Sequence, residues 1–257
     1  MAGNEKEVTE FLVLNKGKVS LEGLGIVNSI GAPSLSKEGC LEIGNVKDVK
    51  KYLSTEDSRK KADIYVNNHG VSIKQAGSSF LYNRLQRANI LEVFTLLGFS
   101  NPGSMLQRLD KEVSAFHNGN LERRNRPWQD FFNEEDFKAL VKFLMVQGSP
   151  NVGFSSHPAE FILEAPAVGL SEANIKVFTF DQYFAEYKNK IKIAIRRQWV
   201  GQDSESEHGR AVGLVEKKEN APWVFNEAVG TPRSGWMEGF PVSKRQTVYF
   251  LMIEKER

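Results

Sequence analysis

The sequence predicts a mixed α/β fold in which a central mixed β-sheet is flanked by helices. Residues 63–66 and 71–75 alternate apolar and polar side chains on either side of a turn-forming segment, which is typical of a β-hairpin. Residues 133–147 carry an apolar stripe at helical spacing, and residues 247–253 are apolar on both faces, as in a buried strand. These segments indicate that helices and strands are interleaved along the chain.

Composition limits the class of protein. The 257 residues are 40% hydrophobic and 26% charged, which is ordinary for a globular chain and excludes wholesale disorder. The formal charge is only +2, so a polyanion would have to be bound by a local basic patch. The single cysteine, Cys40, excludes a disulfide framework and a Cys-rich zinc module. No apolar run approaches the about 20 residues that span a bilayer, so we expect a cytoplasmic protein with no membrane partner.

The first half of the chain is predicted to be largely helical around the hairpin. Val8, Phe11 and Leu12 lie at helical spacing and predict a short helix, which a Gly- and Ser-rich stretch with short strand pieces follows. Gly148 and Pro150 end the apolar stripe of the last predicted helix. In chain order, the expected helices cover residues 4–14, 46–53, 79–98, 104–117 and 133–147.

The second half is predicted to be richer in strands. Isoleucine alternates with polar or small residues over residues 191–196, which indicates a half-buried strand. Residues 198–245 show little periodicity. Because no Pro- or Gly-rich linker separates two parts of the chain, we expect one domain over residues 1–257.

The predicted hairpin has one apolar and one polar face. If the hairpin closes symmetrically around residues 68–69, Asp63 lies directly opposite Lys74. Side chains that are directly opposite share a face, with Cβ atoms about 4.5–5.5 Å apart. A slip of one residue would mix the two faces, so the pattern favours this alternation. The apolar face is then Ile64, Val66, Val71 and Ile73, and the polar face is Asp63, Tyr65, Ser72 and Lys74.

Asp63 and Lys74 allow two interpretations. The carboxylate can hold a divalent cation, the ammonium can orient a water molecule beside it, and a substrate phosphate can complete the coordination sphere. This arrangement suits metal-assisted hydrolysis of a phosphodiester. The alternative is a surface ion pair on a solvated sheet face, worth about 0–1 kcal/mol. The spacing alone leaves both interpretations open.

Asp63, a hairpin and then Ser72-Ile73-Lys74 resemble the core motif of the PD-(D/E)xK nuclease superfamily, to which most type II restriction endonucleases belong. The family pattern is an aspartate, a short spacer and glutamate-x-lysine on the next strand. Asp63 and Lys74 match this pattern, whereas Ser72 stands where the glutamate is expected and would replace it through a bound water. The resemblance covers mainly residues 1–90. It implies a restriction-endonuclease-like core with inserted DNA-recognition loops.

The resemblance also implies a metal site. Asp63 would ligate Mg²⁺ with the main-chain carbonyl of Ile73 as a second ligand, and one or two ions would be bound per active site. Lys74 would position the attacking water. A supporting acid is expected in the first helix, where Glu5 and then Glu7 are the candidates; for either residue, the alternative is a solvated helix side chain.

Polar side chains after the hairpin are candidates for contacts with DNA. Arg84 and Arg87 are predicted to share one helix surface and suit DNA phosphates, although a solvated basic face is the alternative. Arginine and glutamine near the end of the later strand suit base edges in the major groove, but Asp203, Glu205 and Glu207 dilute the positive charge there. The candidate DNA-binding residues are Gln75, Ser78, Ser79, Asn83, Arg84, Arg87, Arg196, Arg197, Gln198, Gln202 and Arg210.

Together these expectations describe a Mg²⁺-dependent, sequence-specific endonuclease of double-stranded DNA that resembles the type II restriction class. Residues 1–100 would hold the catalytic hairpin with its flanking helices, and residues 187–257 would supply strands and loops that read DNA. Three alternatives remain: a catalytically inactive DNA-binding protein on the same fold, a repair or RNA-processing nuclease, and a protein in which Asp63 and Lys74 are purely structural. The resemblance implies a companion DNA methyltransferase in the same cell, and a homodimer that cuts both strands stays open.

Overall fold

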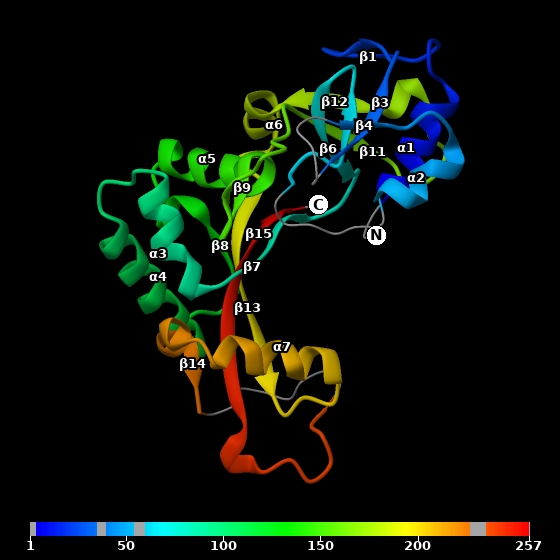
Figure 1. Ribbon diagram of the computed structural model, residues 1–257. Helices are drawn as coiled ribbons and strands as arrows, with labels where there is room; N and C mark the ends of the chain where they lie inside the picture. Colours follow the sequence, from blue (N-terminus) through cyan, green and yellow to red (C-terminus); the bar gives the residue numbers. More distant parts are fainter. Residues whose placement is uncertain (1–3, 35–39, 54–59, 227–234, 257) are drawn as a thin grey trace. The chain divides into compact units, whose positions relative to one another are not determined.

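The computed structural model has a mixed α/β architecture and describes residues 4–34, 40–53, 60–226 and 235–256 (Figure 1). The chain divides into two compact units, although no linker in the sequence marks the division. Each unit is assembled from segments that are separated in the sequence. Unit 1 comprises Met1–Ser79 and Val141–Lys190 with the C-terminal residue, and unit 2 comprises Phe80–Leu140 and Ile191–Glu256.

Unit 1 contains the predicted N-terminal helices, the hairpin and a second run of strands. Its helical segments are α1 (Glu5–Leu14), α2 (Val46–Leu53), the π-helical η2 (Phe143–Gln147), the 3-10 turn η3 (Glu172–Asn174) and α6 (Phe180–Tyr187). Its strands are β1 (Ser20–Leu21), β2 (Gly25–Ile26), β3 (Ile30–Pro33), β4 (Cys40–Glu42), β5 (Ile64–Val66), β6 (His69–Gln75), β9 (Gly148–Ser149), β10 (Gly153–Phe154), β11 (Phe161–Ala165) and β12 (Lys176–Thr179).

The main sheet of unit 1 has six strands in the order β12-β11-β6-β5-β3-β4. Strand β11 runs parallel to β6, and the other neighbours are antiparallel, so the sheet is mixed. A parallel pair needs a long crossover connection, and here the chain passes through part of unit 2 between β6 and β11. The predicted mixed sheet with flanking helices is therefore present in this unit.

Helices α1 and α2, which Figure 1 shows in unit 1, pack on the apolar face of the hairpin. Val8 and Leu12 of α1 and Val49 of α2 are fully buried in one cluster with Ile64 and Val71 of the hairpin. Burying each such side chain contributes about 1.5–3 kcal/mol relative to leaving it in water. The helix expected over residues 4–14 from the helical spacing of its apolar residues is thus present as α1.

The hairpin forms, but its turn lies one residue earlier than expected. Asn67 and Asn68 occupy the turn with φ of 50° and 69°. A tight two-residue turn that matches the twist of its strands needs positive φ at both positions, and asparagine tolerates that conformation. Strand pairing therefore begins with Val66 opposite His69.

This register keeps the apolar and polar faces of the hairpin but does not place Asp63 opposite Lys74. Ile64 is opposite Val71, and both are buried. Symmetrical closure around residues 68–69 would have paired each residue of β5 with a residue two positions further along β6. A shift of two positions leaves every side chain on the same face of the hairpin. Lys74 is therefore not directly opposite Asp63, and that prediction is wrong; Lys74 lies further along β6.

Unit 2 is built on a long antiparallel strand pair, β13 (Ile191–Val200) and β15 (Gln246–Lys255). Its other strands are β7 (Phe80–Leu85), β8 (Asn125–Pro127) and β14 (Val224–Phe225). Its helices are α3 (Arg87–Leu96), α4 (Pro102–His117), α5 (Glu134–Lys142), which ends in unit 1, and α7 (Glu205–Val215). Its 3-10 segments are η1 (Trp128–Asp130), η4 (Lys218–Trp223) and η5 (Val242–Lys244).

The five-stranded sheet of unit 2 has the order β14-β15-β13-β8, and β7 also pairs with β15. Figure 1 shows α7 alongside β13 and β15, where Ala211 and Leu214 of the helix join a core cluster with Val248 and Phe250. The predicted strand at residues 191–196 is longer than expected, because β13 continues to Val200.

Two segments differ from the sequence-based expectation. The helix predicted over residues 79–98 begins only at Arg87, since the residues before it form β7. Residues 198–245, which show little periodicity, contain the helix α7. Among the described residues, no helix is long and apolar enough to cross a membrane.

Candidate functional site

Asp63 lies where the pairing between β5 and β6 ends. Its main-chain N–H donates to the carbonyl of Val71 at 2.9 Å, although Val71 is already the register partner of Ile64. Asp63 and Ile64 are thus both opposite Val71, as in a β-bulge. A β-bulge changes the direction in which a side chain leaves the strand. Asp63 Oδ2 accepts hydrogen bonds from the N–H of Ile73 at 2.6 Å and from Ser72 Oγ at 3.3 Å. The carboxylate is therefore fixed against β6.

A third charged residue, Lys61, lies close to Asp63 and Lys74. Burial and then the Lys74 ammonium lower the pKa of Lys61 to about 8, while Asp63 acts in the opposite direction. The Lys61 ammonium donates a hydrogen bond to the carbonyl of Leu144 at 2.9 Å. Asp63 and Lys74 are not directly opposite, but Ser72, which donates to Asp63, lies two residues before Lys74 on β6, and both charges act on Lys61. Asp63, Lys74 and Lys61 therefore lie in one region of unit 1.

The neighbouring strand adds a buried carboxylate. Glu164 of β11 is the register partner of Lys74 in the parallel pair, so both side chains leave the sheet on the same face. Glu164 is only 5% exposed, and it accepts hydrogen bonds from the hydroxyls of Tyr187 at 2.8 Å and Tyr183 at 3.4 Å. Burial first and the Glu164 carboxylate second raise the pKa of both tyrosines, which keeps their hydroxyls protonated as donors.

The residues around Asp63 fit a hydrated magnesium ion. In the part of the chain that the structure describes, Asp63 Oδ1 accepts no hydrogen bond. The Ile73 carbonyl points to the same strand edge as its N–H, which contacts Asp63. Mg²⁺ keeps several waters and takes one or two carboxylates, so this donor set suits it. No group of three or more His, Cys, Asp or Glu side chains that could hold a metal occurs among the described residues.

Glu5, the predicted supporting acid, is the first residue of α1. The preceding Asn4 donates from Nδ2 to the carbonyls of Ala165 at 2.7 Å and Pro166 at 3.0 Å. The helix therefore begins at the C-terminal end of β11. Since α1 packs on the apolar face of the sheet, Glu5 lies at the end of the strands and on the helix opposite to the face that carries Lys74.

The first group of predicted DNA contacts is divided between the two units. Gln75 is exposed at the end of β6, and Ser78 follows in a turn in which its N–H donates to the Gln75 carbonyl. Ser78 and Ser79 do not cap a helix, because β7 follows them. Asn83 is exposed on β7 in unit 2.

Arg87 is engaged within unit 2. Its guanidinium makes a two-point contact with the Asp110 carboxylate at 2.7 and 2.8 Å, and it also donates to the carbonyl of Glu219. Only 17% of its side chain is exposed. Two-point pairing of this kind fixes a guanidinium firmly, so Arg87 connects α3, α4 and η4.

The second predicted group lies on β13 and after it. Arg196 pairs with Glu254 on the neighbouring strand β15. The Arg197 guanidinium lies over the Trp199 ring, 4.8 Å from its centroid. Gln202 follows the strand and makes an isolated bridge with Trp236.

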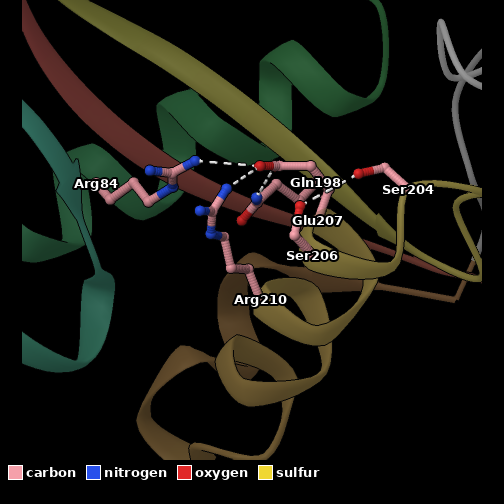
Figure 2. A network of polar contacts seen from close by, with 6 residues as sticks. All are labelled: Arg84, Gln198, Ser204, Ser206, Glu207 and Arg210. Carbon is pink, nitrogen blue, oxygen red and sulfur yellow. Dashed lines mark hydrogen bonds and ion pairs between the residues drawn. The ribbon is translucent and has the colours of Figure 1, made fainter. Parts of the chain in front are cut away.

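Three predicted DNA contacts converge on one acid that the sequence analysis treated only as a diluting charge. Figure 2 shows Arg84 from β7, Gln198 from β13 and Arg210 from α7 around the carboxylate of Glu207. Arg84 Nη2 lies 3.5 Å from Glu207 Oε1, the oxygen that Arg210 also contacts. Gln198 donates to Oε2. We call Arg84, Gln198, Glu207 and Arg210 the Glu207 cluster.

Of the residues that sequence reasoning missed, Glu164 left the clearest signal. It is the only charged residue in the strand Phe161–Ala165, and an acid within an apolar strand indicates a buried partner. Lys61 belongs to a charged segment before the hairpin and gave no such sign. Arg210 lies three residues after Glu207 on α7, but the contacts of Glu207 with Arg84 and Gln198 depend on tertiary packing that no local pattern shows.

Comparisons with protein-family models, curated proteins and solved structures find no match to this chain. The likeness to the PD-(D/E)xK pattern thus remains a resemblance carried by Asp63 and Lys74, from which Ser72 departs. Functional inference rests on these residues and on the side chains that surround them.

Proposed function

We propose that this chain is a Mg²⁺-dependent, sequence-specific endonuclease of double-stranded DNA that resembles the type II restriction class. The observation that carries the proposal is the gathering of Asp63, Lys74 and Lys61 in one region of unit 1, with one carboxylate oxygen of Asp63 left to bind a cation. A carboxylate and a nearby ammonium at the edge of a sheet are the groups that metal-assisted phosphodiester hydrolysis requires.

Each residue has a distinct role in this proposal. Asp63 Oδ1 and the Ile73 carbonyl hold the ion, which supplies positive charge to the scissile phosphate when bound. Lys74 donates a hydrogen bond to the attacking water and orients it toward phosphorus. Ser72 is 1% exposed and donates its hydroxyl to Asp63, so it orients the ligand rather than replacing the usual glutamate as a metal contact.

Two carboxylates are candidates for the acid that the motif lacks. Glu164 shares the polar face with Lys74 and is its register partner, whereas Glu5 starts the helix on the other face. Glu164 is already bound by two tyrosine hydroxyls. We therefore assign Glu164 to supporting the polar face of the sheet next to Lys74, and Glu5 is the candidate that is left for a metal contact.

The test is incubation of plasmid DNA with the protein and Mg²⁺. Discrete fragments support the proposal, and sequencing their ends gives the recognition site. Lys74→Ala should lower the cleavage rate by about 10²–10⁴-fold, because the attacking water loses its donor, while duplex DNA is still bound. Lys50→Ala is the matched control: Lys50 is exposed on α2, which covers the other face of the sheet, and cutting should be unchanged.

One observation favours a second candidate, a DNA-binding protein that does not cleave. Asp63 accepts the Ile73 N–H where main-chain pairing ends, which is a structural role that needs no metal. A gel shift of duplex DNA without cutting at any Mg²⁺ concentration would select this candidate. Preference for single strands or RNA in a competition assay would instead select a repair or RNA-processing nuclease.

A further inference from the structure

The Glu207 cluster has the geometry of a receptor for an anion. Side-chain donors from three elements, β7, β13 and α7, reach the two oxygens of one carboxylate. The guanidinium group can pair with carboxylate and phosphate oxygens through the same two-point geometry. The two arginines outnumber the single acid, so the cluster keeps one positive charge in excess.

The cluster combines open and buried parts. The side chains of Arg210, Arg84 and Glu207 are 50%, 35% and 28% exposed, so an external anion can reach them. Gln198 is only 3% exposed, and the Nε–H donor of Arg84 finds no hydrogen-bond partner among the described residues. Buried polar atoms without partners are costly, so the free protein does not satisfy this cluster fully.

We propose that Arg84, Gln198 and Arg210 form a binding site for one phosphodiester group of DNA, which Glu207 fills in the free protein. The proposal rests on the DNA-binding part of the proposed function. A backbone phosphate takes the place of the Glu207 carboxylate, which turns toward solvent from the first turn of α7. The acid thus acts as an internal competitor and lowers the affinity for DNA until enough other contacts form.

The alternative is an ion-pair cluster that only holds β7, β13 and α7 together. The two possibilities predict different effects of a Glu207 substitution on the affinity for DNA. Removing the charge of Glu207 strengthens DNA binding if the acid competes with phosphate, because two arginines are released and a repulsive charge is lost. If the cluster is only structural, the same change destabilises unit 2 and leaves DNA binding unchanged or weaker.

The experiment measures binding of a fluorescently labelled duplex by anisotropy, in EDTA so that nothing is cut. At roughly 50 mM salt we expect Glu207→Gln to bind about three- to tenfold more tightly than the unaltered protein. Glu205→Gln is the matched control, because it removes the same charge from the same helix at an exposed residue outside the cluster. It should change affinity less than about twofold.

A second pair of variants covers the case in which Glu207→Gln does not fold. Arg210→Gln should weaken binding and make the slope of log K against log salt shallower by about 0.9, the value for one lost phosphate contact. Lys218→Gln removes the same charge from an exposed position outside the cluster and should leave the slope unchanged. Thermal melting of each variant reports its folding separately.

The outcomes separate this proposal from the proposed nuclease activity. Equal affinity of the Glu207→Gln and Glu205→Gln variants, or an unchanged salt slope for Arg210→Gln, overturns the phosphodiester site even if plasmid is cut. Tighter binding by Glu207→Gln in a protein that never cuts plasmid supports the site and rejects the nuclease. If neither the unaltered protein nor Glu207→Gln binds duplex DNA, both proposals fall.

Discussion

Lys61 is a partly buried lysine whose titration should appear in the stability of the protein. Its pKa is about 8 in the folded state, lowered by burial and by Lys74 from the usual 10.5 that it regains on unfolding. Between these two pH values the unfolded chain binds a proton that the folded chain does not, so the free energy of unfolding rises with pH. Below pH 8 both states are charged, and the cost of burying the ammonium is fully present.

Lys61→Met removes this titration. We expect the unaltered protein to gain about 2–3 kcal/mol relative to the variant as pH rises from 8 toward 10.5. Urea denaturation of both proteins in EDTA at several pH values measures the difference. Lys50→Met, at an exposed lysine, controls for general effects of charge. Parallel pH profiles for Lys61→Met and the unaltered protein would contradict the prediction.

Glu164 should matter for the rate of cleavage more than for the binding of DNA. If the chain cleaves DNA as proposed, Glu164→Gln removes the carboxylate that is the register partner of Lys74, and we expect kcat to fall about tenfold or more with little change in KM. Tyr187→Phe removes a donor to Glu164 but keeps its charge, so its effect on kcat should be much smaller. Equal losses in the two variants would mean that Glu164 acts only through packing and hydrogen bonding.

At the scale of single elements, the sequence predicted secondary structure correctly where the spacing of its apolar residues fitted a helix or a strand but not both. The bounds of α2 agree with the expected helix over residues 46–53. Leu81 and Leu85 are four residues apart, a spacing that fits one face of a helix and also one face of a strand. The segment is in fact β7, in which Arg84 has a φ of +59° and the pairing with β15 is irregular. Tertiary pairing with β15 therefore decided what the local pattern left ambiguous.

In the candidate site too, residues that are close in sequence could be predicted, and contacts between distant segments could not. Asp63 and Lys74 could be found because a single hairpin carries both. The turn position was missed because Asn67, Asn68 and His69 all tolerate turn conformations, and only the strand twist selects among them. Lys61 was missed because its hydrogen-bond partner, the carbonyl of Leu144, lies far along the chain. Glu164 carried a signal as an acid in an apolar strand, but its place next to Lys74 depends on pairing with the distant strand β6.

The turn of the hairpin gives a matched test of this element. Asn67 Oδ1 accepts from the N–H groups of Asn28 and Ser29, and Nδ2 donates to the carbonyls of Leu24 and Ile26. Asn67→Gly keeps the positive φ but loses these bonds, so it should cost about 2 kcal/mol of unfolding free energy.

Asn68→Gly is the control for that test. Asn68 also has positive φ, and the structure gives its side chain no hydrogen bond within the described residues. Glycine should therefore change stability there by less than about 0.5 kcal/mol, as chemical denaturation can measure. Similar losses at both positions would show that the bonds of Asn67 add little.

At the scale of the whole molecule, the tryptophans distinguish the two units. All four, Trp128, Trp199, Trp223 and Trp236, belong to unit 2, which also holds the Glu207 cluster, whereas the candidate metal site belongs to unit 1. Intrinsic fluorescence therefore reports on unit 2.

We expect duplex DNA to change the tryptophan fluorescence and Mg²⁺ alone to leave it unchanged. Trp199 lies under the Arg197 guanidinium, and Trp236 bridges to Gln202, so DNA bound by these residues would alter the surroundings of both indoles. The Lys74→Ala variant should keep the DNA response, because Lys74 lies in unit 1. A change in tryptophan fluorescence on adding Mg²⁺ without DNA would contradict the prediction, because it would indicate that the ion binds in unit 2.

The parallel pairing of β6 with β11 has a consequence for the time at which the site is complete. The hairpin that carries Asp63 and Lys74 can close within about 1–10 μs of leaving the ribosome, since its strands are adjacent in the sequence. Glu164 follows about 90 residues later and, at about 5–20 residues per second, is synthesised several seconds afterwards. A nascent chain thus forms the hairpin first, and β11, which places Glu164 next to Lys74 in the sheet, can pair with β6 only late in synthesis.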